Sequence, residues 1–417
     1  MKRVQFRIPG IVGTILKRIQ GAGFEAYVVG GAVRDMVMGR TPSDWDIVTS
    51  ASAEKVEGLF PHLTRFSLQH GTISLVSEGK HYEVSAFRGR SPTIEHDLAH
   101  RDFTVNAMAW DPDEKRLIDP WGGTRDVKRR LVRAVGAPED RFREDPLRIL
   151  RAVRIACELD FRIEGKTRDA LSTMAPSLAG VAGERVRDEV TRILLSERPS
   201  RGLRDLVRTG LLDQIAPELV EGRRKGRRMV HRGFLETVDR VDPDPVLRLA
   251  ALFHRVGEDK KEQEKQSAGI TEVVMGRLKF SGRMISDVTH LVMHHGDVIH
   301  YDPSWDDGAV RRLVRRVGLE RLDHFFSLCR AVLESQGKDT GLLSDLEERV
   351  RSGLKAGFPC RVQNLKVDGR KVMEVLGLPE GPEVGGILEA LLEEVLDHPE
   401  WNTEEKLIER LKEINRD

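Results

Sequence analysis

The sequence predicts an α+β protein in which a small mixed α/β head is followed by a long all-helical body. Two observations predict this fold class. Up to about residue 135, β-branched or alternating runs such as AYVVGG, WDIVTS and HYEVSAF are separated by turns. From about residue 139 onward, apolar residues recur at helical spacing in one segment after another. We therefore expect a mixed or antiparallel sheet in the head and helices in the rest of the chain.

The predicted elements follow a clear order along the chain. IVGTILKRIQ has helical spacing, and AYVVGG is a short buried strand that breaks at a glycine pair. WDIVTS, GTISLVS and HYEVSAF are the next predicted strands. EDPLRILRAVRIACELDF, TRDALSTMAPSLAGV and VRDEVTRILLS are the first predicted helices of the body.

Composition narrows the class of protein. The 417 residues include 68 Lys and Arg against 67 Asp and Glu, which excludes a uniformly basic nucleic-acid coat but not a local basic face. An aromatic content of 5% disfavours a surface built on base stacking. Cys157, Cys329 and Cys360 are far apart, and no 18-residue apolar run occurs. We expect a reduced, cytoplasmic protein that neither spans a membrane nor is secreted.

VVGGAVRD, residues 28–35, runs from a strand through two glycines into a helix. Gly30 and Gly31 allow the backbone to approach a ligand closely, and the start of a helix offers free N–H groups to an anion. Arg34, one turn later, is placed to add charge-assisted hydrogen bonds to a phosphate. A plain structural turn is the alternative for the glycine pair alone.

SDWDIVTSA, residues 43–51, carries two carboxylates in a stretch that otherwise indicates a strand. Side chains two positions apart on a strand point the same way, so Asp44 and Asp46 would repel each other unless they share a cation. Mg²⁺ is usually bound through one or two carboxylates plus substrate phosphates. Glu83, in the strand-like run HYEVSAF, is the best candidate for a third carboxylate. The alternative is a surface strand with solvated acids.

EDPLRILRAVRIACELDF predicts an amphipathic helix whose polar half carries one acid and three arginines. Ile149, Leu150, Val153, Ala156 and Cys157 fill the apolar half. The polar half carries Asp145, Arg148, Arg151 and Arg154. A carboxylate acceptor and a guanidinium donor match the Watson–Crick edge of cytosine or adenine. The alternative is a helix with a solvated basic face.

Four motifs in order carry a resemblance to a known family. VVGGAVRD, DWD, HRDFTVNAMA and REDPLRILRAVRIA resemble the class II tRNA nucleotidyltransferases and bacterial poly(A) polymerases, which share the DNA-polymerase-beta superfamily head. The resemblance covers about residues 25 to 215 and continues more weakly to the C-terminus. It implies a nucleotidyltransferase head at 1–137, a helical neck at 138–200, a helical body at 201–335 and a tRNA-binding helical tail at 336–417.

The resemblance also implies roles for individual residues. Asp44 and Asp46 would hold catalytic Mg²⁺ ions, and Gly31 and Arg34 would contact the incoming triphosphate. HRDFTVNA would contact the sugar and phosphate of the nucleotide through Arg101, Asp102 and Asn106. Asp145 and Arg148 would read the base, with Arg151 and Arg154 helping to place the nucleotide. His100 stands where the family usually has a first arginine. Without the family, Asp102 would be interpreted as a helix cap.

The implied activity is template-independent transfer of C, and possibly A, from CTP or ATP to the 3′ end of tRNA, with release of pyrophosphate. The implied partners are the tRNA acceptor arm, CTP or ATP, and Mg²⁺; no obligate protein partner is expected. By the same resemblance, the short segment RSPTIEHDLA, residues 90–99, favours CC-only addition over full CCA addition, because full CCA-adding members usually have a longer loop there. The alternatives are poly(A) tailing of RNA and a non-catalytic RNA-binding scaffold.

The body contains two further motifs. LRLAALFHRVG, residues 247–257, resembles the core of an HD phosphohydrolase domain, but Arg255 follows His254 where the metal-binding aspartate would be. A cation is a poor metal ligand, so we expect a degenerate HD-like scaffold rather than a working hydrolase. RRKGRRMVHR, residues 223–232, is a candidate phosphate contact, with a solvated loop as the alternative.

Overall fold

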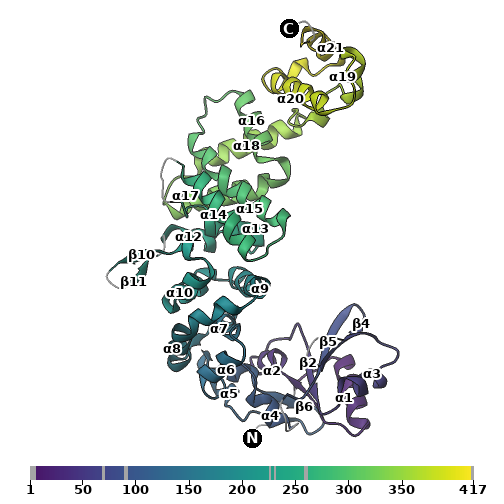
Figure 1. The fold of residues 1–417 in the computed structure, drawn as a ribbon, viewed down its shortest axis with the longest axis vertical. Helices are drawn as coiled ribbons and strands as arrows, with labels where there is room; N and C mark the ends of the chain where they lie inside the picture. Colours follow the sequence, from purple (N-terminus) through teal and green to yellow (C-terminus); the bar gives the residue numbers. More distant parts are fainter. Residues whose placement is uncertain are drawn as a thin grey trace. The chain divides into compact units, whose positions relative to one another are not determined.

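The computed structural model describes residues 6–67, 71–88, 93–224, 227–229, 232–257 and 262–414. The chain forms two compact units, Met1–Pro217 and Glu218–Asp417 (Figure 1). The predicted mixed-sheet head followed by helices is confirmed. The finer division into neck, body and tail stays a prediction. Among the described residues, no helix combines the length and the apolar character needed to cross a membrane.

The first unit is built on a seven-stranded mixed sheet in the order β3-β4-β5-β2-β1-β6-β7. Only β2 and β5 pair in parallel, and the other neighbours are antiparallel. The strands are β1 (Ala26–Val29), β2 (Asp46–Thr49), β3 (Thr64–Ser67), β4 (Thr72–Ser77), β5 (Lys80–Ala86), β6 (Ala109–Asp111) and β7 (Arg116–Ile118). A short parallel pair follows: β8 (Leu131–Val132) and β9 (Arg162–Ile163).

One face of the sheet carries the apolar core that fixes the orientation of the strands. Its buried members are Tyr27, Val29, Val48, Phe87, Ile94, Leu98, Ala109 and Ile118. Because Val29 pairs with Asp46 and Tyr27 with Val48, alternation places the Asp46 side chain on this same face, at the first residue of β2. The prediction that Asp44 shares that strand was wrong. Asp44 lies in the bend that precedes β2.

The remaining elements of the first unit are helices (Figure 1). Around the sheet lie α1 (Gly10–Gly21), α2 (Gly31–Val37), α3 (Ala53–Leu59), α4 (Ile94–Ala99), the 3₁₀ turn η2 (Thr104–Asn106) and α5 (Gly123–Arg129). Next come α6 (Pro138–Glu144), α7 (Arg148–Leu159), α8 (Gly165–Met174), η3 (Ala175–Gly180), α9 (Gly183–Leu194), α10 (Pro199–Thr209), α11 (Leu211–Ile215) and η4 (Pro217–Leu219). Helix α7 packs against both α9 and α10.

The prediction of one continuous helix through Asp145 and Arg154 was wrong at its start. The chain is extended at Asp145 (φ −149°, ψ 103°), and α7 begins only at Arg148. Pro146 is the physical reason, because a proline ring disfavours the helical conformation in the residue before it. Just before α7, Asp145 Oδ1 accepts the N–H of the N-cap residue Leu147 at 3.1 Å.

The described residues of the second unit are helical apart from one hairpin. The strands β10 (Glu221–Arg224) and β11 (Arg227–Met229) pair antiparallel, so the loop alternative for residues 223–232 is wrong for the described backbone. Residues 225–226 and 230–231 lie outside the described residues, and the phosphate contact stays a prediction. The helices are α12 (Arg232–Arg240), α13 (Pro245–Phe253), α14 (Gln263–Arg277), α15 (Gly282–His294), η5 (His295–His300), α16 (Asp307–Val317), η6 (Leu319–Arg321), α17 (Leu322–Ser335), α18 (Gly341–Lys355), η7 (Val362–Asn364), α19 (Gly369–Leu376), α20 (Pro382–Asp397), η8 (Pro399–Trp401) and α21 (Glu404–Ile414).

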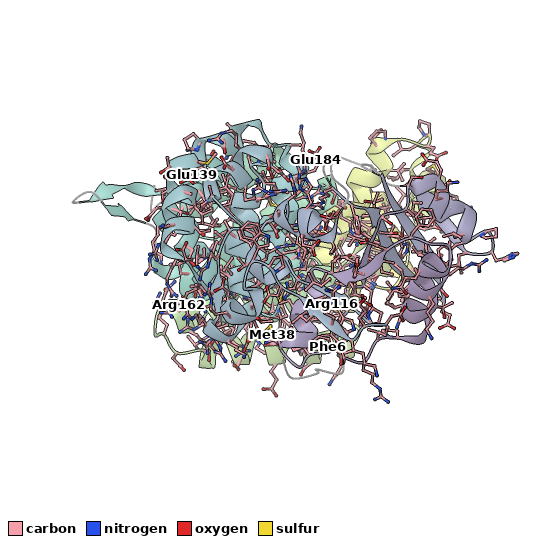
Figure 2. The ribbon with its side chains drawn as sticks, turned by 90° about the horizontal axis from the view of Figure 1, so that it is seen from below. Phe6, Met38, Arg116, Glu139, Arg162 and Glu184 are labelled. Atoms are coloured by element: carbon pink, nitrogen blue, oxygen red, sulfur yellow. The ribbon has the colours of Figure 1, made fainter. Side chains whose placement is uncertain are left out.

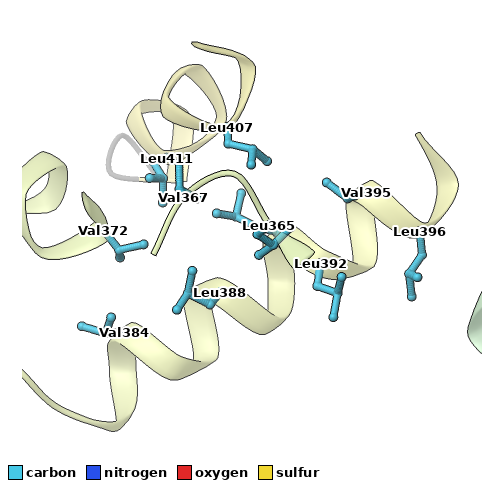
Figure 3. Close-up of a cluster of buried hydrophobic side chains, with 11 residues drawn as sticks. Leu365, Val367, Val372, Val384, Leu388, Leu392, Val395, Leu396, Leu407 and Leu411 are labelled. Atoms are coloured by element: carbon cyan, nitrogen blue, oxygen red, sulfur yellow. The ribbon is translucent and has the colours of Figure 1, made fainter. Parts of the chain in front are cut away.

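A separate apolar cluster holds the C-terminal helices together (Figure 3). Leu391 and Val395 of α20 and Leu407 and Leu411 of α21 are fully or almost fully buried in it. These positions are four residues apart on each helix, so they form one stripe per helix. The stripes face each other, which explains why the last 50 or so residues fold as a helical cluster.

Candidate active site

Two adjoining cavities in the first unit bring the predicted site residues together. The inner cavity, of about 280 Å³, is lined by Gly30, Gly31, Asp46, Arg88, Arg101, Asp102, Asn106, Asp145, Leu147, Arg148, Arg151 and Arg185. The central cavity, of about 550 Å³, is lined by Gly31, Ala32, Arg34, Asp35, Ser43, Asp44, Trp45, Asp46, His81, Glu83, Asn106, Arg151, Arg154, Ile155, Glu158 and Arg192. Every residue that the sequence analysis singled out as catalytic or nucleotide-binding lines one of them. Their roles stay predictions.

Gly30 is the point where the backbone, a carboxylate and a guanidinium meet. Its φ is +72°, a conformation that favours glycine. A Cβ at this position would lie 3.2 Å from Asp46 Oδ2 and 3.1 Å from a terminal nitrogen of Arg101. The glycine pair therefore does more than turn the chain, because it leaves room for both side chains in the inner cavity.

The carboxylates of Asp46 and Glu83 lie on neighbouring strands at the same level. The two residues are partners in the parallel register of β2 and β5, so their side chains share a face. Burial raises the pKa of Asp46; Arg101 opposes this shift and Asp44 adds to it. Burial, followed by repulsion from Asp46 and Asp44, also raises the pKa of Glu83. The site thus holds carboxylates that destabilise one another in their charged form.

The donor set of this site fits a hard divalent cation. Carboxylate oxygens are the ligands that Mg²⁺ prefers, and a cation between them removes the repulsion that raises their pKa values. Within the described ranges, no three or more His, Cys, Asp or Glu side chains stand in a ready-made metal geometry. Asp44, Asp46 and Glu83 all line the central cavity, and a Mg²⁺ site is commonly completed by substrate phosphates.

Asp102 differs from Asp46, although both line the inner cavity. Its Oδ2 accepts two hydrogen bonds from the Arg151 guanidinium, at 2.9 and 2.8 Å, and its Oδ1 accepts the Phe103 N–H at 2.8 Å. Burial alone would raise the pKa of Asp102, but Arg151 and the backbone bond bring it down to about 2. The helix-cap interpretation misses this pairing, because Arg151 lies 49 residues away in the chain.

A chain of hydrogen bonds extends from Asp102 to α2. Asn106 donates to Asp102 Oδ1 at 3.4 Å and accepts from Arg34 at 2.9 Å. The Arg34 guanidinium also bonds Asp35. The structure therefore links the glycine turn, η2 and α7 through side chains that the sequence analysis chose separately.

Asp97 and Arg88 are two residues that the sequence analysis missed. Asp97 is fully buried, and its two oxygens accept the Arg101 Nε–H and the Arg88 backbone N–H, each at 3.1 Å. Arg88 lines the inner cavity, where burial lowers the pKa of its guanidinium. The acid just before HRDFTVNA was the available signal, because a buried aspartate requires a partner.

The two residues predicted to read a base lie at one wall of the inner cavity. Arg148 is largely buried and donates to Glu144 at 2.8 Å and to the His100 carbonyl at 3.0 Å. Asp145 pairs with Arg185 of α9 at 3.0 Å, a residue that the sequence analysis did not select. The wall is polar and its side chains are already hydrogen-bonded, which fixes their directions.

Arg154 lines the central cavity and is also paired with an acid. It is buried, and its Nε lies 3.0 Å from Glu189 Oε2. Glu189 also lies 3.8 Å from Arg151. The alternative of a solvated basic face is wrong for both Arg151 and Arg154, because each has a buried carboxylate partner.

His254 of the HD-like segment, and His294 and His295 near the end of α15, each have a polar partner within the protein. His254 Nδ1 is 2.9 Å from the Ala251 carbonyl, and its ring meets His295 edge-on at 5.5 Å. His295 Nδ1 is 2.8 Å from the Val292 carbonyl, and His294 pairs with Asp297 at 3.2 Å. No metal-binding group of three was found among the described residues here either.

Comparisons with known proteins match almost the whole chain. Residues 26–133 match the poly A polymerase head domain, and residues 160–222 match the probable RNA and SrmB-binding site of polymerase A. The CCA-adding enzyme of Leuconostoc mesenteroides is 39% identical over 221 residues, which are 50% of this chain and 55% of that enzyme. The CCA-adding enzyme of Geobacillus stearothermophilus is 31% identical over 419 residues and 96% of each chain.

A solved structure agrees over the same length. The Bacillus stearothermophilus CCA-adding enzyme in complex with CTP has a TM-score of 0.77 and 30% identity, and the match covers 97% of this chain and 96% of that one. The similarity extends over nearly the full length of the chain and agrees with its polymerase-beta-like head and two polar cavities. The chain therefore belongs to the CCA-adding enzyme family and is a tRNA nucleotidyltransferase.

Proposed function

We propose that this enzyme transfers cytidylyl, and then adenylyl, groups from CTP and ATP to the 3′ end of tRNA without a nucleic-acid template. The full-length relatives are CCA-adding enzymes, and one solved relative holds CTP. One observation of this chain carries the proposal. The mutually repelling carboxylates of Asp46 and Glu83, with Asp44 beside them, adjoin an arginine-lined cavity across the Gly30 turn.

The family uses a divalent metal ion, and we propose that it is Mg²⁺ here. Asp44 and Asp46 would hold it, with Glu83 as a third oxygen ligand. When bound, such an ion stabilises charge on phosphate oxygens and makes a nearby hydroxyl more acidic. In the overall reaction the RNA 3′-hydroxyl attacks the α-phosphate of the nucleotide, one P–O bond forms, and pyrophosphate leaves with the electrons of the bond that breaks.

The other residues of the two cavities bind and orient the nucleotide. Arg34, held by Asn106, and Arg101, held by Asp97, provide donors for the triphosphate. Asp145 and Arg148 at the wall of the inner cavity present an acceptor and donors toward the base edge. A fixed protein edge replaces the template strand, because both side chains are held by hydrogen bonds before any substrate arrives.

CC-only addition is a second candidate function. The short segment 90–99 favours it, whereas the names of the relatives favour full CCA addition. Residues 90–92 of this segment lie outside the described residues, and α4 begins at Ile94. We also propose a cytoplasmic location, because the substrates are tRNA and nucleoside triphosphates and the three cysteines are buried and free.

The deciding experiment supplies tRNA ending at the discriminator base, at C and at CC, each with labelled CTP or ATP alone. We expect C on the first two substrates and A on the CC-ended tRNA; absence of A there would leave CC-only addition. Asp44→Ala should abolish all incorporation, and Asp113→Ala, an exposed acid outside both cavities, should not. Incorporation that survives in Asp44→Ala would contradict the proposal.

A further inference from the structure

Arg185 reaches the acid that is proposed to read the base. It lies in the first turn of α9, directly after Glu184, which Figure 2 labels. Its Nη2–H donates to Asp145 Oδ2 at 3.0 Å. Among the described residues, Asp145 is the only acid that forms an ion pair with Arg185. Because Asp145, Arg148 and Arg185 all line the inner cavity, Arg185 is a third charged side chain at this wall.

A polar stripe on α9 fixes the position of Arg185 relative to α7. Arg185, Glu189 and Arg192 stand at positions i, i+4 and i+7, so they lie on one face of the helix. The buried Glu189 lies 3.0 Å from Arg154, and Arg192 donates to Glu158 at 2.9 Å. Both partners belong to α7. A rotation or shift of α9 would break both contacts, so the start of α9 is held beside the wall of the inner cavity.

The Asp145 carboxylate is held at both of its oxygens. Oδ1 accepts the Leu147 N–H at 3.1 Å, and Oδ2 accepts the Arg185 guanidinium. Each carboxylate oxygen has two lone-pair positions, so each can accept one more hydrogen bond. An ionised carboxylate accepts from the exocyclic amino group of cytosine or adenine, but it repels the carbonyl oxygen that uracil and guanine have at the corresponding position. The direction and charge of this carboxylate would therefore decide which base is accepted.

The ion pair of Arg185 and Asp145 is too exposed to contribute much to folding. The two side chains are 53% and 30% exposed, and ion pairs with such access to solvent add little stability. Asp102, by contrast, is 8% exposed in its pair with Arg151. An ion pair that adds little stability but orients a side chain at a cavity wall is suited to ligand selection rather than to folding.

We propose that Arg185 is a positioning residue for base selection, which directs the ionised Asp145 carboxylate toward the amino group of the incoming base. This inference rests on the proposed function, in which Asp145 and Arg148 read the base, and it adds a residue that sets the preference against uracil. Without the guanidinium, Asp145 keeps only the Leu147 N–H and can rotate about its terminal torsion. CTP then loses an aligned acceptor, whereas UTP loses a repulsion.

The test measures the equilibrium binding of CTP and of UTP to the full-length enzyme, with Mg²⁺ and without tRNA, so that no transfer occurs. We expect Arg185→Gln to raise the Kd for CTP roughly tenfold and to leave the Kd for UTP unchanged or lower. Arg185→Lys keeps a charged donor and should restore part of the preference for CTP. Arg187→Gln is the matched control: Arg187 lies in the same helix, pairs with the neighbouring Asp188 at 2.9 Å and lines neither cavity. This control should bind both nucleotides as wild type does.

A double variant separates base selection from a general effect on the fold. In the background of Asp145→Asn the carboxylate charge is already absent, so Arg185→Gln should change the preference for CTP little further. The thermal midpoints of Arg185→Gln and Arg187→Gln should both equal that of wild type, as expected for exposed ion pairs.

Three results would overturn the inference while wild-type binding upholds the proposed function. These are an unchanged preference for CTP in Arg185→Gln, an equal loss of preference in the Asp145→Asn background, and a midpoint of Arg185→Gln well below that of Arg187→Gln. A wild-type enzyme that binds CTP and UTP equally would instead contradict the proposed function.

Discussion

Asp46 and Asp102 line the same cavity, but their surroundings have opposite effects. At the start of β2, burial raises the pKa of Asp46; Arg101 opposes this shift and Asp44 adds to it. On the side of α7, the doubly bonded Arg151 and the Phe103 N–H bring the pKa of Asp102 down to about 2, against the effect of burial.

The difference separates two kinds of carboxylate. Asp102 already has its counter-charge from the protein, so it stabilises the native state as an ion. Among the described residues Asp46 forms no such ion pair, and burial disfavours its charge, so a cation from outside would stabilise that charge. A buried acid that the fold leaves under-neutralised is therefore a better indicator of a ligand site than a buried acid alone.

The strongest test of the difference between Asp46 and Asp102 compares the variants Asp46→Asn and Asp102→Asn. We expect Asp46→Asn to lower kcat about a thousandfold or more, because the proposed metal ligand would contribute several kcal/mol to the transition state. Its thermal midpoint should equal or exceed that of wild type, since the variant removes a charge that burial disfavours. Mg²⁺ should raise the midpoint of wild type but not of Asp46→Asn. A variant that keeps its activity, or melts below Asp102→Asn, would contradict the comparison.

The second expected effect concerns stability. Asp102→Asn should cost about 2 kcal/mol of unfolding free energy at pH 7, below the usual cost of breaking a buried ion pair. The expected cost is lower for two reasons: the Arg151 side chain is one third exposed, and Glu189 remains 3.8 Å from Arg151 as a second partner. Urea unfolding measures this difference, and Asp46→Asn serves as the control with the same substitution in the same cavity.

The stability contributed by Asp102 should depend on pH in a direction that its lowered pKa sets. Because the pKa of Asp102 falls from 3.8 to about 2 on folding, its contribution is present above about pH 4 and is lost as the pH falls toward 2. The stability gap between wild type and Asp102→Asn should therefore close between pH 5 and pH 2, by about 2 kcal/mol. A gap that stays constant over this range would show that the pair acts through packing instead.

The smallest expected effect tests whether Asp97 positions Arg101 for the nucleotide. Asp97→Asn should raise the KM for CTP roughly tenfold with a smaller change in kcat, because one charge-assisted hydrogen bond to Arg101 is lost. Asp126, equally buried and paired with Arg133 at 2.8 Å outside both cavities, is the matched control. Asp126→Asn should lower stability and leave the KM for CTP unchanged. Equal effects of the two variants on that KM would assign Asp97 a purely structural role.

Much of the fold was predictable because periodicity is local. AYVVGG, WDIVTS and HYEVSAF became β1, β2 and β5, and the helical period after residue 139 became the helical elements. The short strands β6 and β7 escaped prediction, because three residues carry too little alternation. The break at Asp145 was also missed, although Pro146 was visible, because the apolar pattern continues across it.

The site was predictable where residue types carry the chemistry and unpredictable where partners are distant. Asp44 and Asp46 stand out because two acids are rare beside a buried strand. The parallel register that places Glu83 level with Asp46 requires strand pairing, which a single sequence does not contain. Arg185 reaches Asp145 from 40 residues away, and Glu189 holds Arg154 through helix packing, so neither partner has a local signal.

The conformation of Gly30 has a consequence for how the gene can vary. Every other amino acid has a Cβ, and a Cβ at residue 30 would press on Asp46 and Arg101 in a backbone geometry that L side chains rarely adopt. Each missense change in that codon therefore strains the backbone and pushes one proposed metal ligand and one proposed phosphate donor by a few tenths of an ångström at once. A single methyl group can distort the site while all its charged residues remain in the sequence.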